Sequence, residues 1–262
     1  MRARKTVPGD LPALKALWKQ AFGDSDAEID AFFTAVYPSA FGFCTEEDGR
    51  VIAMLYALPV TLAEGEQAQK AAYLYAVATD EAFRKRGVCR SLMEYAERAL
   101  QKRYLACLLL VPATETLAQY YETLGYTRQN GCILQTLRVE TPKGRALPVS
   151  VMDYAGLRET MLFETAHVRY PKVLLDYEAG RAKLFRLELG GGIGCAAAFL
   201  QDGVAVVEEL LPDARYLPAL AAELGAERYV VRTPGQGSFG CMAKRLDDAP
   251  CTEAVYLPFA FD

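Results

Sequence analysis

The chain has 262 residues, of which 52% are hydrophobic and 24% charged, a balance that suits one large globular domain or two modest ones. Its formal net charge is −4, so binding to nucleic acid would require a strongly segregated basic face. No apolar run is long enough to span a membrane, and the N-terminus lacks the apolar core of a secretory signal. We therefore expect a soluble cytoplasmic protein with neither a nucleic-acid partner nor a membrane partner.

Cysteine and histidine usage argues against a metal site. The seven cysteines are odd in number, widely scattered and without a CxxC pair, and His167 is the only histidine. We expect reduced cysteines and no bound metal. His167 follows a helical segment, where a lone histidine is more often a packed or capping residue than a base.

The first half of the chain alternates between helical and strand periodicity. It predicts helices over 10–22 and 26–35, the second capped by Asp26, and strands over 41–45, 51–62 (interrupted by Pro59) and 70–79. Further along, it predicts a helix over 88–101, a buried strand over 104–111, a helix over 116–124 ended by Gly125, and a closing strand over 133–139.

The second half repeats this scheme in a shortened form. It predicts helices over 153–164 and 216–224, and strands over 183–189, 195–200, 204–211 and 228–233. The segment Thr141-Pro142-Lys143-Gly144 is the best linker between the halves. We therefore predict two domains, 1–141 and 147–262, that arose by a diverged duplication.

The most informative stretch runs from Tyr75 to Arg90, where a strand passes through a short turn into a helix that starts at Gly87. Four cations surround this glycine: Arg84, Lys85, Arg86 and Arg90. The amides of a helix's first turn lack intrahelical partners, and the helix dipole makes that end positive. Because cations there oppose the dipole, the pattern favours a phosphate site over a solvated run of charges.

The segment AVATDEAFRKRGVCRSLM resembles motif A of the GCN5-related N-acetyltransferases, with Arg84, Gly87 and Cys89 at its three signature positions. Cys89 departs from the family's glycine or alanine but is still small. That family holds acetyl-CoA between splayed central strands. The resemblance implies that the backbone of Val77, Ala78 and Thr79 meets the acetyl and pantetheine arm. It also implies that six amides hold the diphosphate: those of Lys85, Arg86, Gly87, Val88, Cys89 and Arg90.

A second motif lies where this family has one. The segment TLAQYYETLGY, from Thr116 to Tyr126, is similar to the family's FYxxLGF helix. The resemblance makes Tyr121 the general acid, because a phenol with a pKa near ~10 can protonate the departing thiolate. Thr116, at the start of the same helix, is included among the coenzyme-binding residues, whereas Tyr120 is expected to be a core residue.

The whole arrangement is similar to the tandem acetyltransferases of the enhanced-intracellular-survival type, without their sterol-carrier domain. The resemblance implies an α+β acyl-CoA N-acyltransferase fold with two tandem lobes, each a central mixed sheet flanked by helices. In the second half, the acidic stretch from Glu208 to Asp213 stands where a coenzyme loop would begin. We expect this lobe to be degenerate and to shape the acceptor pocket.

No general base is evident near motif A. Many family members carry a glutamate on the preceding strand, but residues 71–79 contain no acid. In tandem members, and in the similarly duplicated myristoyltransferases, the terminal carboxylate enters the catalytic lobe. The chain ends YLPFAFD, so Asp262 is a candidate base. The plainer alternative is a terminal strand that only closes the second lobe.

The sequence thus predicts an acetyl-CoA-dependent N-acetyltransferase that moves an acetyl group directly to a primary amine of a small-molecule or peptide acceptor. The alternative is a catalytically weak acyl-CoA-binding or ligand-sensing protein, which the missing strand acid and Cys89 favour and which Tyr121 and the basic loop oppose. Two GxGxxG-like strings, beginning at Gly192 and Gly235, leave too little chain for a dinucleotide-binding unit and are expected to be turns or bulges.

Overall fold

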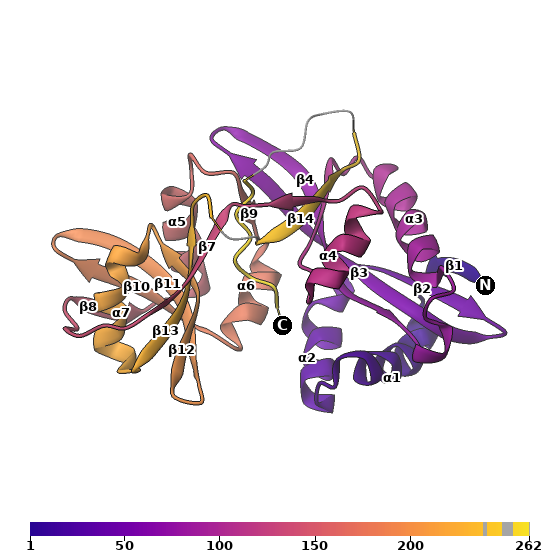
Figure 1. The fold of residues 1–262 in the computed structure, drawn as a ribbon, viewed down its shortest axis with the longest axis horizontal. Helices are drawn as coiled ribbons and strands as arrows, with labels where there is room; N and C mark the ends of the chain where they lie inside the picture. Colours follow the sequence, from indigo (N-terminus) through magenta and orange to yellow (C-terminus); the bar gives the residue numbers. More distant parts are fainter. Residues whose placement is uncertain (238–239, 248–253, 262) are drawn as a thin grey trace.

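The computed structural model describes residues 1–237, 240–247 and 254–261, which form two lobes lying side by side (Figure 1). The first lobe is built on an eight-stranded sheet in the order β1-β2-β3-β4-β5-β14-β6, with β9 paired to β3. Its strands are β1 (Arg2–Lys5), β2 (Phe41–Glu47), β3 (Arg50–Glu64), β4 (Gln67–Thr79), β5 (Cys107–Leu110), β6 (Thr127–Gln129), β9 (His167–Arg169) and β14 (Cys241–Arg245). Among the named strands of the described residues, β4 and β5 are the one parallel pair of this sheet, so the sheet is mixed.

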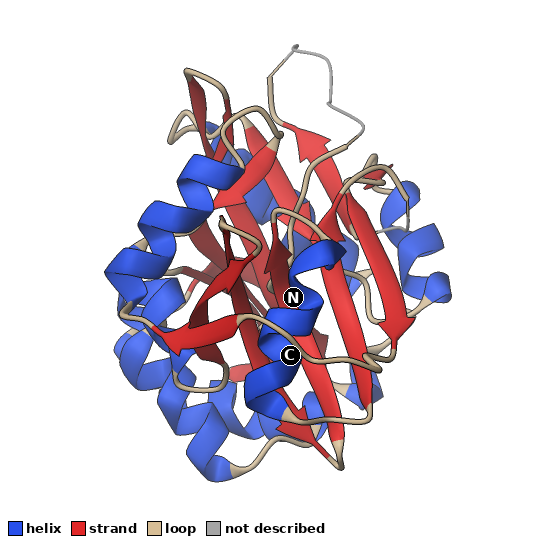
Figure 2. Cartoon of the chain, turned by 90° about the vertical axis from the view of Figure 1, so that its left-hand side faces the viewer, coloured by secondary structure: helices blue, strands red, loops and turns tan. Residues whose placement is uncertain are grey.

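Helices flank the strands on both sides of the molecule, as Figure 2 shows. One apolar cluster joins α1 (Leu11–Phe22) and α2 (Asp26–Ala35) to the sheet, and another joins α3 (Val88–Gln101) and α4 (Glu115–Glu122) to the opposite face. The helix α2 begins with a capping box, in which Ser25 accepts from the Glu28 amide at 3.3 Å. The cap is therefore Ser25, and the prediction of Asp26 was wrong by one residue.

The second lobe has a six-stranded sheet in the order β7-β13-β12-β11-β10-β8. Its elements are β7 (Cys132–Leu137), β8 (Arg145–Pro148), β10 (Lys183–Leu189), β11 (Gly192–Gln201), β12 (Val204–Leu211), β13 (Arg228–Pro234), α5 (Val151–Met161), α6 (Lys172–Ala179) and α7 (Leu217–Leu224). Here β12 and β13 are the parallel pair, joined through α7 as β4 and β5 are joined through α3. The prediction of two lobes with mixed sheets and flanking helices is confirmed.

The two lobes exchange strands. After β6 the chain crosses to the second sheet, where β7 pairs with β13. It returns through β14, which lies between β5 and β6, with Ala243 opposite both Leu109 and Thr127. The strand predicted over 133–139 therefore exists, but the prediction that it closes the first unit was wrong. The division at residues 141–147 stays a prediction.

Glycines in the second lobe allow neighbouring elements to pack closely, because they have no side chain. A Cβ on Gly194, in β11, would lie 2.6 Å from the Leu211 carbonyl oxygen and 2.8 Å from the Tyr216 ring. Gly192 is also in β11, so the string that begins there lies in a strand, and the register of this strand with β12 shifts after Ala197, where the string ends. Of the two expected alternatives, turn or bulge, the irregularity of the strand fits the bulge. None of the helices in the described ranges is long and apolar enough to cross a membrane.

Candidate acyl-CoA site between β4 and β5

The parallel strands β4 and β5 separate toward their carboxyl ends. They pair only where Ala71–Tyr73 faces Cys107–Leu109. Beyond that point β4 continues along β3 as far as Thr79, while β5 keeps β14 as its other neighbour. The two strands therefore form a V, and ligands of sheets with parallel strands bind outside such carboxyl ends.

A β-bulge lies in the arm of the V that belongs to β4. Tyr75 pairs with Tyr56 and Ala78 with Met54, so β4 carries one residue more than β3 over this interval. Ala76 has a φ of 49°, in a region that residues with side chains seldom adopt. Because a bulge leaves one residue outside the ladder, the local backbone is freed for another partner.

A cavity of about 440 Å³ fills the V, a volume within the usual range of small-molecule sites. Its walls come from α1 and the residues after it, from β4, from the end of β5, and from α4. The lining residues are Trp18, Phe22, Asp24, Tyr73, Leu74, Tyr75, Ala76, Val77, Leu110, Val111, Pro112, Ala113, Leu117 and Tyr121. The cavity is largely aromatic and aliphatic, with one carboxylate, Asp24.

Tyr121 forms part of the α4 wall of this cavity. The helix is capped by Thr114, whose hydroxyl accepts from the Leu117 amide at 3.2 Å. The side chain of Tyr121 is only 6% exposed, and this burial, reinforced by the nearby Cys89, raises its pKa above the ordinary value for a phenol. Tyr121 therefore stays protonated at neutral pH, as a proton donor must.

The turn after β4 is fixed by a buried aspartate. Asp80 accepts from the Ala82 amide at 3.0 Å and forms an ion pair with Arg50. These contacts set a single 3-10 turn over Glu81–Phe83 and direct the chain into the loop before α3.

The loop before α3 presents a run of open amides. Lys85 and Gly87 have φ values of 62° and 76°, and the first bond of α3 runs from the Ser91 amide to the Gly87 carbonyl at 3.0 Å. Within the described ranges, the amides of residues 85–90 have no backbone acceptor. A Cβ on Gly87 would meet nothing within 4 Å, so space lies in front of these donors. Unbonded amides that face open space at a helix start are the arrangement that binds anions in proteins.

The four cations of this loop divide into two kinds. Arg84 donates to the Thr79 carbonyl at 3.2 Å, and Arg90 donates to the Thr123 hydroxyl at 2.9 Å, so both guanidiniums brace the loop. Arg86 lies over the Phe83 ring at 5.1 Å and is exposed, as is Lys85. Lys85 and Arg86 are therefore the cations available to a bound anion.

The other predicted coenzyme residues take different positions. Val77 lines the cavity, whereas Ala78 and Thr79 pair with β3 beyond it. Val88 is buried beneath the loop, and Cys89 is half-buried, with the pKa of its thiol raised by burial. Thr116 is exposed on the first turn of α4, where its neighbour Leu117 forms the cavity wall.

The C-terminal segment 255–261 is buried and runs between the two lobes (Figure 1). Beside β9, the Tyr256 amide donates to the Ala166 carbonyl at 2.8 Å. Further along, the hydroxyl of Tyr75 in β4 donates to the Phe261 carbonyl at 2.5 Å. Phe261 is thus held at the cavity wall, and the predicted Asp262 lies outside the described residues.

His167 and the acids of the second lobe lie away from this cavity. His167 is buried in β9, with Nδ1 2.7 Å from the Thr165 carbonyl and Nε2 3.2 Å from Glu159. Glu208 and Glu209 are buried in β12, not in a turn, and Glu209 binds the buried Arg158 at 2.9 Å. Of that acidic stretch, only Asp213 caps the turn that follows, so the expectation of an acidic loop was largely wrong.

Two cavity residues were missed as site residues. Trp18 lies in the helix predicted over 10–22, and its indole lines the cavity and donates to Asp24 at 2.7 Å. Asp24 lies between the two predicted helices, and no sequence signal marked it as a site residue. The alternating Tyr73 and Tyr75 of β4 were the one sequence signal for an aromatic wall, because alternate strand residues share a face.

Solved structures share this two-lobed fold. A conserved Enterococcus faecalis V583 protein of unknown function, suggested to be an N-acyltransferase, has a TM-score of 0.75 at 16% identity over 94% of this chain and 72% of that chain. A GCN5-related N-acetyltransferase from Kribbella flavida gives 0.73 at 16% identity, over 94% and 72% of the two chains. Eis1 from Mycobacterium abscessus gives 0.67 at 11% identity, over 94% and 74%. The fold is that of the two-lobed acyl-CoA N-acyltransferases.

A known family model matches the first lobe. Residues 2–128 match the family model described as an acetyltransferase (GNAT) domain, and this range includes both the loop at Gly87 and the helix of Tyr121. The first lobe is therefore a GNAT domain, which confirms the resemblance seen in the sequence. A comparison with curated proteins finds no match.

Proposed function

We propose that the protein is an acetyl-CoA-dependent N-acetyltransferase that moves an acetyl group directly to the primary amine of a small acceptor. One observation carries this proposal: the cavity in the V between β4 and β5 has Tyr121 in its wall, and the open amides of the loop at Gly87 follow directly after β4. Acetyl-CoA, with a diphosphate joined to a long, narrow arm that ends in the thioester, matches that combination.

The residues divide the binding of acetyl-CoA between them. The amides of residues 85–90 would hold the diphosphate, with the exposed Lys85 and Arg86 adding charge. The bulge at Ala76 and Val77 would offer backbone to the thioester end of the arm. This assignment follows the family resemblance and agrees with the open backbone found at both places.

The chemistry requires two proton transfers. The neutral amine attacks the thioester carbonyl, the carbon–sulfur bond breaks, and the thiolate takes the hydroxyl proton of Tyr121. The amine meanwhile loses a proton to a base, for which we propose the terminal carboxylate of Asp262. The support is the position of Phe261, whose carbonyl accepts from Tyr75 on the cavity wall.

A short extension after Asp262 tests the base. It moves the terminal carboxylate, and turnover should fall sharply while acetyl-CoA still binds. The same extension placed before Met1 is the matched control and should leave turnover unchanged. Full turnover in the C-terminally extended protein would exclude this carboxylate as the base.

The walls of the cavity favour an acceptor amine on an apolar body. Trp18, Phe22, Tyr73 and Tyr75 present rings, and Asp24 is the one carboxylate in the lining. One Asp24 oxygen accepts from the Trp18 indole at 2.7 Å, which leaves the other for an ammonium group. Since the acetyl-bearing arm shares the cavity, the space left suits a small arylalkylamine better than a polycation.

Isothermal titration with acetyl-CoA, together with a thiol-release assay over a panel of amines, tests the function. The panel should include phenethylamine, tryptamine, spermidine, kanamycin and a lysine peptide. We expect binding of acetyl-CoA and turnover with the arylalkylamines. Tight binding without turnover on any amine would instead support a ligand-sensing protein, and the absence of any heat would overturn both functions.

A further inference from the structure

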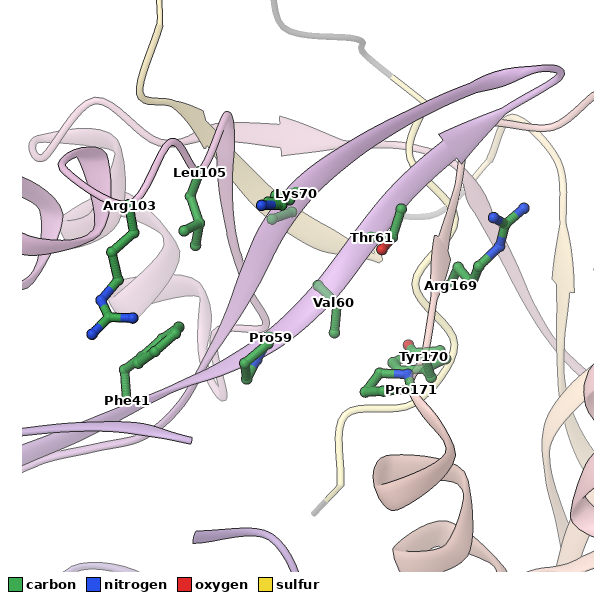
Figure 3. A pocket seen from close by; sticks show the side chains of 11 residues that line it. Phe41, Pro59, Val60, Thr61, Lys70, Arg103, Leu105, Arg169, Tyr170 and Pro171 are labelled. Atoms are coloured by element: carbon green, nitrogen blue, oxygen red, sulfur yellow. The ribbon is translucent and has the colours of Figure 1, made fainter. Parts of the chain in front are cut away.

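A second cavity of about 440 Å³ lies toward the start of β4, away from the V (Figure 3). Its floor is apolar, with Pro59 and Val60 of β3 facing Leu105 and Pro171. Lys70, Arg103 and Arg169 stand around the floor, and the Arg103 guanidinium lies 4.5 Å from the centre of the Phe41 ring.

Two further hollows continue this surface. One, of about 270 Å³, shares Phe41 and Arg103 with the first cavity and adds Lys5. The next, of about 370 Å³, shares Lys5 and Arg103 and adds two more cations, Arg98 and Lys102. Because neighbouring hollows share residues, they form one continuous surface. We call it the basic belt, and its cations are Lys5, Lys70, Arg98, Lys102, Arg103 and Arg169.

The belt is basic although the whole chain has a net negative charge. The sequence has 33 acidic residues and 29 basic ones, yet among the residues that the structure describes no aspartate or glutamate lines any of the three hollows. Arg169 is paired with Glu159, but the described residues offer no carboxylate ion pair to the other five cations. The dipole of α3 accounts for cations at its C-terminal end, but not for Lys5 on β1 or Lys70 on β4.

An exposed aromatic side chain stands beside the belt. Tyr104 follows Arg103 in the turn after α3 and is 89% exposed. Its φ is 59°, a left-handed conformation that costs a residue with a side chain about 1–2 kcal/mol. A large ring held in solvent by an unfavourable backbone is a feature typical of recognition sites.

We propose that the basic belt docks an acidic segment of a partner protein, in which carboxylates alternate with apolar side chains. The carboxylates would meet the cations, and the apolar side chains would enter the hollows over Pro59, Leu105 and Pro171. Tyr104 would cover one side of the segment. A nucleic acid fits less well, because its bases need several exposed rings, and because the net charge of −4 repels a long phosphate chain.

Fluorescence anisotropy with a labelled peptide of repeated Glu-Glu-Leu units, added to the full chain, tests this site. We expect salt-sensitive binding that falls about tenfold or more in the variant Lys102→Glu/Arg103→Glu. The matched control is Lys183→Glu/Arg228→Glu, which makes the same charge change at exposed second-lobe residues and should leave the affinity nearly unchanged. Tyr104→Ala should weaken binding several-fold without loss of folding, since the side chain is exposed.

Three outcomes would overturn the proposal. They are the absence of peptide binding at low salt, equal losses in the belt variant and its control, and binding of oligothymidylate or of phosphatidylserine vesicles in place of the peptide. The acetyl-CoA affinity of both double variants, measured in parallel, should equal that of the unmodified protein. The peptide-docking proposal and the proposed acetyltransferase function are therefore tested independently of each other.

Discussion

The substitution Gly87→Glu tests the loop on which the coenzyme assignment depends. A Cβ at this position meets nothing within 4 Å, so the side chain fits without a clash. The φ of 76° is left-handed, and a residue with a side chain pays about 1–2 kcal/mol there. For a chain of this size each kcal/mol lowers the Tm by about 2–4 °C, so the variant should fold with a modestly lower Tm.

The effect on acetyl-CoA binding should be much larger. The new carboxylate would share the space in front of the amides with a diphosphate. Two like unit charges about 4 Å apart repel by about 1 kcal/mol in bulk water and about 4 kcal/mol near a protein surface. The affinity should therefore fall by about fivefold to a thousandfold, as measured by titration calorimetry.

The matched control is Gly203→Glu in the hairpin between β11 and β12. Gly203 has a φ of 79° and nothing within 4 Å of a Cβ, so it shares the backbone penalty but lies far from the loop. Both variants should lose similar thermal stability, and only Gly87→Glu should lose acetyl-CoA. Unchanged affinity in Gly87→Glu, or equal losses in both variants, would refute the placement of the diphosphate.

Three further substitutions test two residues of the cavity, Tyr121 and Asp24, and one buried carboxyl group of the second lobe, that of Glu178. Tyr121→Phe keeps the ring and removes the proton, so turnover should fall about a hundredfold or more with little change in acetyl-CoA affinity; equal losses in both would indicate a structural role. Asp24→Asn keeps an acceptor for the Trp18 indole but removes the charge, so the KM for the amine should rise about tenfold at similar kcat; an unchanged KM would exclude Asp24 as the ammonium partner. Burial and the adjacent Glu208 raise the pKa of Glu178 above its ordinary 4.5, so folding favours the protonated form and stability declines as the pH rises above that value. Glu178→Gln removes this ionisation and should flatten the dependence of the Tm on pH between acidic and mildly alkaline buffer; an unchanged profile would contradict the raised pKa.

Elements whose stabilising contacts are local could be predicted closely. The bounds of α3 agree with the predicted helix over 88–101, because Val88, Leu92, Met93 and Ala96 repeat at helical spacing and are buried together. The loop at Gly87 was recognisable for the same reason, since a glycine next to a helix start is a local signal. In contrast, β14 has five residues and no clear period, and its place depends on partners far earlier in the chain.

The site shows the same division between local and distant contacts. The splayed strands β4 and β5 were expected from the resemblance of the local segment at Gly87 to a family motif. Trp18 comes from α1 and Asp24 from the residues after it, whereas Phe261 lies far along the chain. The periodicity of the sequence does not predict that these segments meet, because only tertiary contacts bring them together.

The strand exchange makes the opening of the V depend on both lobes. β5 leaves β4 after Leu109 yet stays fully buried, because β14 supplies hydrogen bonds along its other edge and Met242 and Ala243 bury the strand. A fragment of residues 1–141 lacks β14, so β5 and β6 would each lose a neighbour, and exposed strand edges promote aggregation. We expect this fragment to show no cooperative thermal unfolding and no acetyl-CoA binding, and co-expression with residues 142–262 to restore both. A fragment that unfolds cooperatively and binds acetyl-CoA like the full chain would show that the first lobe folds alone, and that the returning strand is dispensable for the site.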